Sequence, residues 1–155
     1  MTKRNTKQSK WSLSQQDAER LIKEIKKSVD RLVIMPAPGE QNRQFHVRSE
    51  SDDEDFTIAL FRGKRNPNKH SIAARITHSE VVLMRLCVEG TPHTNPGGSK
   101  IGRTHLHVYH EGVDDRVAYP IDIDSPDFVE DTVMLLDRFH VVRKPNFQEG
   151  IEGTA

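Results

Sequence analysis

The sequence has one cysteine, few aromatic residues and no excess of charge of either sign. Cys87 is the only cysteine in the 155 residues, which excludes a disulfide framework or a cysteine-rich zinc site within one chain. Lysines plus arginines equal aspartates plus glutamates, at 23 each, which argues against a whole-surface attraction to nucleic acid or to an anionic membrane. Any electrostatic partner must therefore bind at a local patch of charge.

Long hydrophobic segments are also missing. No apolar run approaches the roughly 20 residues that a membrane helix needs, and no signal segment starts the chain, so we expect a cytoplasmic protein without a membrane partner. An apolar fraction of 34% beside a charged fraction of 30% indicates polar tails around a modest core. We expect a disordered basic arm over 1–10, a single α+β domain over 11–144 and a flexible tail over 145–155.

Two helices are predicted at the ends of the domain. In "LSQQDAERLIKEIKKSV" (13–29), one apolar stripe recurs at spacings of three and four beneath a charged face, and it consists of Ala18, Leu21, Ile22, Ile25 and Val29. Ser14 can cap the start of this helix. The proline-rich run at 36–40 ends this helical region, because proline removes a backbone donor. In "DSPDFVEDTVMLLDRFHVV" (124–142) we expect a second helix with Ser125 as its cap, followed by proline at the first helical position.

Between these helices the apolar period changes from helical to two, which is typical of strands. Six strands are predicted, at 43–50, 55–63, 70–78, 81–90, 104–112 and 115–122. Their links are short and rich in turn residues, except for "TPHTNPGGSKIGR" (91–103). The order predicts an α+β fold: a curled antiparallel sheet of about six strands flanked by an N-terminal and a C-terminal helix, with one face covered and the other partly open.

The segment "THLHVYHEG" (104–112) has an unusual polar face. Strand alternation places four side chains on that face: His105, His107, Tyr109 and Glu111. All four can transfer protons, ligate metals or bind phosphate oxygens. Alternation also places Arg75 and Arg85 on the polar faces of their strands. In the strand at 81–90, one face is apolar and has Val82, Met84, Leu86 and Val88, and the other has Val81, Leu83, Arg85, Cys87 and Glu89. If the strands are neighbours, the arginines and histidines converge on one open surface.

Two chemistries fit such a surface. In metal-free ribonuclease chemistry, one histidine takes a proton from a ribose 2′-OH, another protonates the leaving oxygen, and arginine stabilises the phosphorane. The catalytic candidates are then His105, His107, Tyr109 and Arg85. The alternative is a site for a divalent metal such as zinc on His105 and His107, with Glu111 or His93 as third ligand. Because nearby arginines favour an anionic phosphate over a cation, we expect no cofactor.

The long loop adds candidates for substrate binding, because it returns directly into the histidine strand. Together with Arg75 on the sheet, these candidates are His93, Asn95 and Arg103. Cys87 is expected to pack as a small buried thiol, and His110 to lie on the apolar side of its strand. In a simpler interpretation, His105 and His107 only form hydrogen bonds with neighbours on the sheet surface.

The block "HTNPGGSKIGRTHLHVYHEGVDDRVAYP" (93–120) resembles a family of small, functionally uncharacterised bacterial and phage proteins, and "RGKRNPNK" (62–69) also fits. The resemblance covers residues 56–122. A weaker likeness is to the TumE-type toxins, which are small and have a clustered histidine motif near a sheet. The chain departs from them in its tyrosine, its glutamate and its Asn-Pro loop.

These patterns give one leading hypothesis and two alternatives. The first is a small RNA-cleaving enzyme of toxin or defence type, with RNA as substrate and a cognate antitoxin or another protein as partner. The second is a cupin-like metal-binding enzyme. The third is a non-enzymatic phage or defence-system inhibitor that binds through the sheet face, which predicts that no single histidine is essential. Burial of His105 and His107 under a partner or under the terminal helix would favour this alternative.

Overall fold

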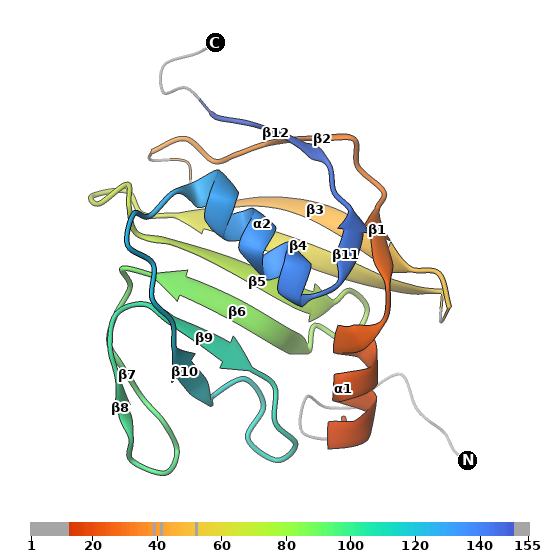
Figure 1. Cartoon of the computed structure of the whole chain (residues 1–155), viewed down its shortest axis with the longest axis horizontal. Coiled ribbons are helices and arrows are strands. Elements are labelled where there is room, and N and C mark those ends of the chain that lie inside the picture. Colours follow the sequence, from red (N-terminus) through yellow and green to blue (C-terminus); the bar gives the residue numbers. More distant parts are fainter. Residues whose placement is uncertain (1–12, 39, 41, 52, 151–155) are drawn as a thin grey trace.

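The computed structural model describes residues 13–38, 40, 42–51 and 53–150, and the basic arm expected over 1–10 lies outside them. All six predicted strands are present: β3 (Asn42–Ser49), β4 (Glu54–Arg62), β5 (His70–Ile76), β6 (Val82–Val88), β9 (His105–Val108) and β10 (Ala118–Pro120) (Figure 1). Two short strands that the pattern does not predict, β1 (Lys26–Ser28) and β11 (Val141–Arg143), extend the sheet. The eight strands run in the order β10-β9-β6-β5-β4-β3-β1-β11.

The fold is α+β, as expected, with a larger sheet than predicted. Neighbouring strands pair antiparallel, apart from β1 and β11, which are parallel. Four further strands form two small ladders: β2 (Leu32–Ile34) with β12 (Asn146–Gln148), and β7 (His93–Thr94) with β8 (Lys100–Ile101). Residues 146–148 therefore form a strand within the segment where we expected a flexible tail.

The first helix, α1 (Gln15–Lys23), is shorter than its apolar stripe predicts. Its cap is confirmed, because the Ser14 hydroxyl accepts a 3.0 Å hydrogen bond from the Asp17 amide. The expectation that Ile25 and Val29 lie in its buried stripe is wrong, since both are more than half exposed. The chain leaves the helix there because the following residues pair as β1 with β3 and β11.

The second helix, α2 (Phe128–Arg138), begins later than predicted. Asp127 is its cap, accepting a 2.9 Å hydrogen bond from the Glu130 amide, so the prediction of Ser125 is wrong. Across the part of the chain that the structure describes, neither helix has the length or apolar character to span a bilayer.

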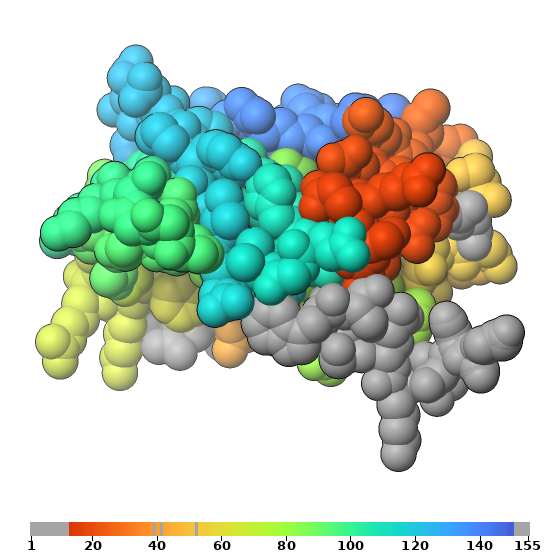
Figure 2. All heavy atoms as spheres, turned by 90° about the horizontal axis from the view of Figure 1, so that it is seen from below, coloured from red at the N-terminus to blue at the C-terminus, as the bar shows by residue number. Residues whose placement is uncertain are grey.

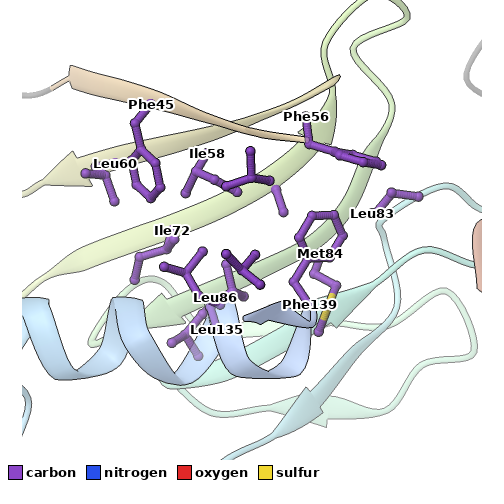
Figure 3. Close-up of a cluster of buried hydrophobic side chains, with 14 of the residues drawn as sticks. Phe45, Phe56, Ile58, Leu60, Ile72, Leu83, Met84, Leu86, Leu135 and Phe139 are labelled. Carbon is purple, nitrogen blue, oxygen red and sulfur yellow. The ribbon is translucent and has the colours of Figure 1, made fainter. Parts of the chain in front are cut away.

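The core lies between α2 and one face of the sheet (Figure 3). On β6, Met84, Leu86 and Val88 face this core, as alternation predicts. Leu83, which we expected on the opposite face, is also fully buried. The register between β5 and β6 shifts after Ala74, and this irregularity breaks the simple alternation. The opposite face of the sheet is only half-buried along β5, so side chains there remain open to a ligand.

Candidate functional site

The pairing of β6 with β9 brings the predicted polar faces together. Arg85 lies opposite His107, and Cys87 lies opposite His105. Cross-strand partners in an antiparallel pair point to the same face of the sheet, with Cβ atoms about 5 Å apart. This face is the one turned away from α2, because the intervening Leu86 packs into the core beneath that helix. The convergence that the sequence predicts for Arg85 and the two histidines is therefore present.

A pocket of about 390 Å³ opens on this face, and we call it the histidine pocket. Its lining includes four imidazoles, one thiol and four charged side chains: His70, His93, His105, His107, Cys87, Lys69, Arg85, Asp115 and Arg116. The start of the loop 91–103 lines the pocket with Thr91, Pro92 and His93, and its β7–β8 hairpin (green) lies beside the segment 104–122 (cyan) in Figure 2. His105 and His107 are only 2% and 3% exposed, so they form the floor of the pocket.

Three of these histidine rings are packed against one another. The ring centroids of His105 and His107 are 4.8 Å apart, and the His93 ring lies 4.8 Å from that of His107 and 5.7 Å from that of His105. His93 comes from the loop, so the long connection does place a side chain over the sheet. Its Nε2 donates a 2.6 Å hydrogen bond to the carbonyl oxygen of Arg116, which holds the ring in place.

Backbone carbonyls fix the tautomers of the two floor histidines. His105 Nδ1 lies 2.7 Å from the Gly102 oxygen, and His107 Nδ1 lies 2.8 Å from the Asp115 oxygen. Because a carbonyl oxygen only accepts, each Nδ1 must carry the proton that it donates. In the neutral rings the lone pair is then on Nε2, and neither Nε2 has a hydrogen-bond partner among the described residues.

Burial keeps both floor imidazoles uncharged. It lowers the pKa of His107 to about 4, and the nearby Arg85 guanidinium acts in the same direction. Burial also lowers the pKa of His105, against the hydrogen bond to Gly102. Near pH 7 these rings therefore act as bases or ligands and are poor proton donors. This differs from the expectation that one of them protonates the leaving oxygen.

Arg85 connects the pocket wall to its floor. Its Nη2 lies 3.2 Å from Asp115 Oδ2, and its Nη1 donates toward Cys87 Sγ at 3.5 Å. Burial raises the pKa of the Cys87 thiol, while Arg85 opposes this shift. The guanidinium is about one third exposed, so it can also bind an anion in the pocket.

Cys87 belongs to this site, although we expected it to be a small buried thiol. The thiol is half-buried, and one ligand atom from each of Cys87, His105 and His107 lies within 4.8 Å of the others. Alternation already places Cys87 on the face of Arg85, so the signal was present in the sequence. The face of Cys87 shows that it meets the histidines only once the pairing of β6 with β9 and its register are known.

Two predicted site residues lie elsewhere in the fold. Tyr109, expected on the face of the histidines, is fully buried in the core, and its hydroxyl donates a 2.7 Å hydrogen bond to the Leu13 oxygen. Burial, Asp114 and Glu111 raise the pKa of this phenol. Glu111, the expected third metal ligand, instead accepts a 2.9 Å hydrogen bond from the Gln15 amide at the start of α1. The strand ends at Val108, so alternation stops applying to both residues.

The expected substrate-binding residues differ in their placement. His93 lines the pocket, whereas Asn95, Arg75 and Arg103 are outside its lining. The Asn95 amide makes two hydrogen bonds with the backbone of Ala118, accepting at 2.8 Å and donating at 3.0 Å. Arg103 donates to the Gly90 oxygen at 3.4 Å. These contacts give Asn95 and Arg103 structural roles in closing the loop.

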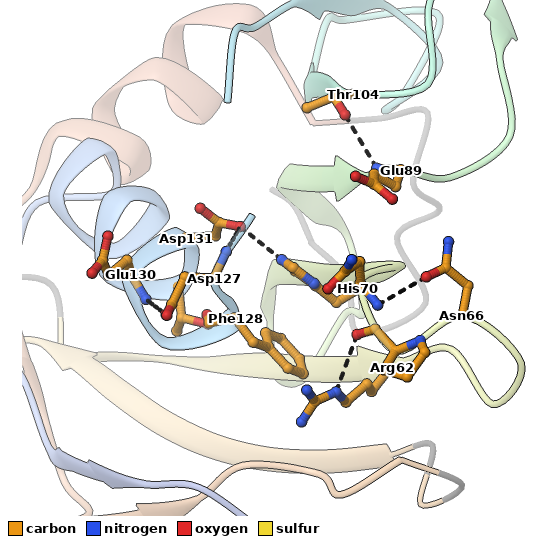
Figure 4. Close-up of polar contacts among 12 residues, drawn as sticks. Arg62, Asn66, His70, Glu89, Thr104, Asp127, Phe128, Glu130 and Asp131 are labelled. Atoms are coloured by element: carbon orange, nitrogen blue, oxygen red, sulfur yellow. Dashed lines mark hydrogen bonds and ion pairs between the residues drawn. The ribbon is translucent and has the colours of Figure 1, made fainter. Parts of the chain in front are cut away.

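Two further histidines differ from their predicted surroundings. His110, expected on the apolar side of its strand, is half-buried and hydrogen-bonded to the Tyr119 hydroxyl at 2.9 Å. His70, to which the sequence assigns no role, lies at the edge of the histidine pocket. Its Nε2 is 2.7 Å from Asp131 Oδ2, and its ring stacks on Phe128 at 4.5 Å (Figure 4). The pair links β5 to the start of α2.

Comparison with known proteins gives one match. The model of one protein family, described as a family of unknown function (DUF6978), matches residues 13–141. No curated protein and no solved structure matches the chain. The matched range includes every residue of the histidine pocket named above.

Proposed function

Because the chain belongs to DUF6978, a family without an assigned function, we propose a function from the geometry of the histidine pocket: cleavage of phosphodiester bonds in RNA. The main support is that four imidazoles and two guanidinium groups line one pocket. Imidazoles supply proton transfer near neutral pH, and a guanidinium binds phosphate oxygens in a bidentate manner. The combination supports chemistry at a phosphate group.

The charges of the pocket favour an anionic ligand. Three cationic side chains line it, Lys69, Arg85 and Arg116, against the single carboxylate of Asp115. The floor histidines add no positive charge near neutral pH, so the attraction comes from the lysine and the arginines. The whole chain has no net charge, and the pocket therefore is a local patch of the kind that the composition requires.

The proposed reaction exchanges one P–O bond for another. The ribose 2′-oxygen attacks phosphorus and loses its proton at the pocket floor, where the Nε2 lone pairs of His105 and His107 lie. Arg85 binds the non-bridging oxygens as negative charge builds on them. The bond from phosphorus to the 5′-oxygen breaks, and that oxygen takes a proton. We assign this step to His93, whose ring packs against that of His107 and is held by the hydrogen bond from its Nε2 to the Arg116 oxygen.

The non-enzymatic alternative rests on burial of His105 and His107 under a partner or under the terminal helix. Both histidines are buried, but α2 covers the opposite face of the sheet, and the loop 91–103 stands over them. Their burial therefore comes from the walls of the pocket itself. This arrangement supports a small-ligand or catalytic site more than a flat protein-binding face.

The test is cleavage of a single-stranded RNA, compared with DNA of the same sequence, by the full chain. The wild-type protein is expected to leave 2′,3′-cyclic phosphate ends on RNA and to leave the DNA intact. His93→Gln and Arg85→Ala should each lower the cleavage rate by about 100-fold or more. Arg43→Ala is the matched control, because Arg43 is 35% exposed, forms one ion pair and lies outside the pocket. RNA left intact by the wild-type protein, with and without added zinc, would contradict the proposal.

A further inference from the structure

We propose that the floor of the histidine pocket is a binding site for a divalent metal ion of the zinc type, held by Cys87, His105 and His107. This inference deepens the proposed function, on which its catalytic meaning rests, by naming the cofactor of the same pocket. Its first support is convergence: one ligand atom from each of the three side chains lies within 4.8 Å of the others. The backbone positions of the three residues are set by the register of β6 and β9.

The distances fit a tetrahedral ion after a small side-chain movement. Zinc lies about 2.0–2.1 Å from imidazole nitrogen and about 2.3 Å from thiolate sulfur, so ligand atoms that share a tetrahedral ion are about 3.4–3.6 Å apart. Ligand atoms up to 4.8 Å apart must therefore approach by about 1.2–1.4 Å. Rotation of the imidazoles and the thiol can supply this shift without movement of the strands.

The surroundings of the two imidazoles are those of metal ligands. Each Nδ1 donates to a backbone carbonyl, from Gly102 for His105 and from Asp115 for His107. Such a bond fixes the ring orientation and leaves Nε2 as the coordinating atom, the arrangement in which a carbonyl supports a metal-bound histidine. Both rings are buried at the floor of the pocket.

Charge in the pocket also fits a metal–thiolate pair. From the sequence, the arginines argue against a second cation. In the structure Arg85 pairs with Asp115 at 3.2 Å, which offsets its charge. Its other nitrogen points to Cys87 Sγ at 3.5 Å, in position to donate to a metal-bound thiolate. A soft thiolate with two imidazoles is a donor set that suits zinc over magnesium or calcium.

Three protein ligands leave the fourth position of a tetrahedral ion open, as in catalytic zinc sites. That position would face the remaining pocket volume, between His93 and Arg85. A substrate oxygen or a water molecule placed there would lose its proton more easily. The ion would take the place of a free imidazole as the activator of the nucleophile, while Arg85 and His93 keep their roles.

The test is a titration of the full, untagged chain with Co²⁺ as a spectroscopic probe, followed by displacement with Zn²⁺. We expect one equivalent of bound Co²⁺, tetrahedral visible bands and a thiolate-to-cobalt charge-transfer band that Cys87→Ser abolishes. His105→Gln and His107→Gln should each weaken Zn²⁺ binding by more than about 100-fold, beyond the 10–100-fold that outer-shell partners contribute. His46→Gln is the control, because His46 is a half-buried strand histidine outside the pocket.

Three results would overturn the proposal: less than about one tenth equivalent of bound metal in the wild-type chain, no loss of affinity in the histidine variants, or no charge-transfer band. Circular dichroism of each variant identifies one that fails to fold, and the Cys87→Ser spectrum then decides the outcome. Tight metal binding without RNA cleavage would support the metal site and contradict the proposed function. RNA cleavage by the protein in a chelator, together with a Co²⁺ titration that shows no bound metal, would support the function and overturn the metal site.

Discussion

Lys26 Nζ lies 3.9 Å from the centroid of the Phe139 ring and donates a 2.8 Å hydrogen bond to the carbonyl oxygen of the same residue. It also donates to the oxygens of Ile22 and Glu24, at 3.0 and 2.8 Å. Glu24 caps the C-terminus of α1 and Phe139 caps that of α2. One fully buried lysine therefore satisfies carbonyl groups at the C-termini of both helices. Helix C-termini favour a cation, which explains a buried lysine in the core.

Replacement of this lysine is expected to destabilise the fold. Lys26→Met keeps the length of the side chain but leaves three carbonyl oxygens without their donor, and we expect a loss of about 2–4 kcal/mol in the free energy of unfolding. The measurement is the midpoint of urea unfolding, with the dependence of the unfolding free energy on urea concentration expected to stay unchanged. Lys27→Met is the matched control: Lys27 is 38% exposed and pairs with an exposed Glu50, so its loss should be below about 0.5 kcal/mol. Equal losses would contradict the role of Lys26.

The same lysine should make stability depend on pH. Burial lowers the pKa of Lys26 from 10.5 to about 7, against the attraction of Glu24. Between these two values the unfolded chain binds a proton that the folded chain does not, so the free energy of unfolding rises as the pH increases. We expect the difference between wild type and Lys26→Met to grow in favour of wild type from about pH 7 to 10.5, and to be constant below pH 7. A constant difference across the whole range would contradict the lowered pKa.

The buried pair of His70 and Asp131 should respond differently to two substitutions. Asp131→Leu leaves His70 Nε2 without its 2.7 Å partner, at an expected cost of about 2–3 kcal/mol in unfolding free energy. Asp131→Asn keeps an acceptor oxygen, and its cost should be below about 1 kcal/mol. Asp137→Leu on the same helix is the control, since Asp137 is 63% exposed. Thermal or urea unfolding measures all three, and a costly Asp137→Leu would point to a general effect on α2.

Asn95 should act on the loop through the backbone of Ala118. Asn95→Ala removes both hydrogen bonds, and we expect faster hydrogen exchange at the Ala118 amide and a loss of about 1–2 kcal/mol in stability. Asn95→Asp keeps the acceptor for the Ala118 amide and loses only the donor, so its effect should be intermediate. The neighbouring Thr94 is exposed, and Thr94→Ala should leave the exchange rate unchanged. Protection that survives in Asn95→Ala would show that the loop is held by other contacts.

Tyr109 gives a further test of placement in the core. Tyr109→Phe removes the hydrogen bond to Leu13 and should lower stability by about 1 kcal/mol. Tyr119→Phe is the control, because that side chain is 46% exposed and its bond to His110 is open to water. Its cost should stay below about 0.5 kcal/mol. A larger cost for Tyr119→Phe than for Tyr109→Phe would contradict the buried position of Tyr109.

The predictions that rest on repeating local patterns are confirmed for most of the sheet. Alternation along β5 and β6 places Arg85 and Cys87 on the face away from the core, because successive strand residues point to opposite faces. The pattern fails at Leu83 and Tyr109, beside a register shift and beyond a strand end. It also misses β1 and β11, since three-residue strands are too short to show a period.

The sequence by itself determined the α+β class, the six central strands and the polar face that contains His105 and His107. These features follow from side-chain period and turn chemistry, which act over a few neighbouring residues. Only the tertiary structure decided that Cys87 lies opposite His105, that Glu111 accepts a hydrogen bond from the Gln15 amide and that the His93 ring packs against that of His107. The register of the strands and the path of the loop bring together residues that are far apart in the chain. A local sequence pattern contains no information about which of these residues come into contact.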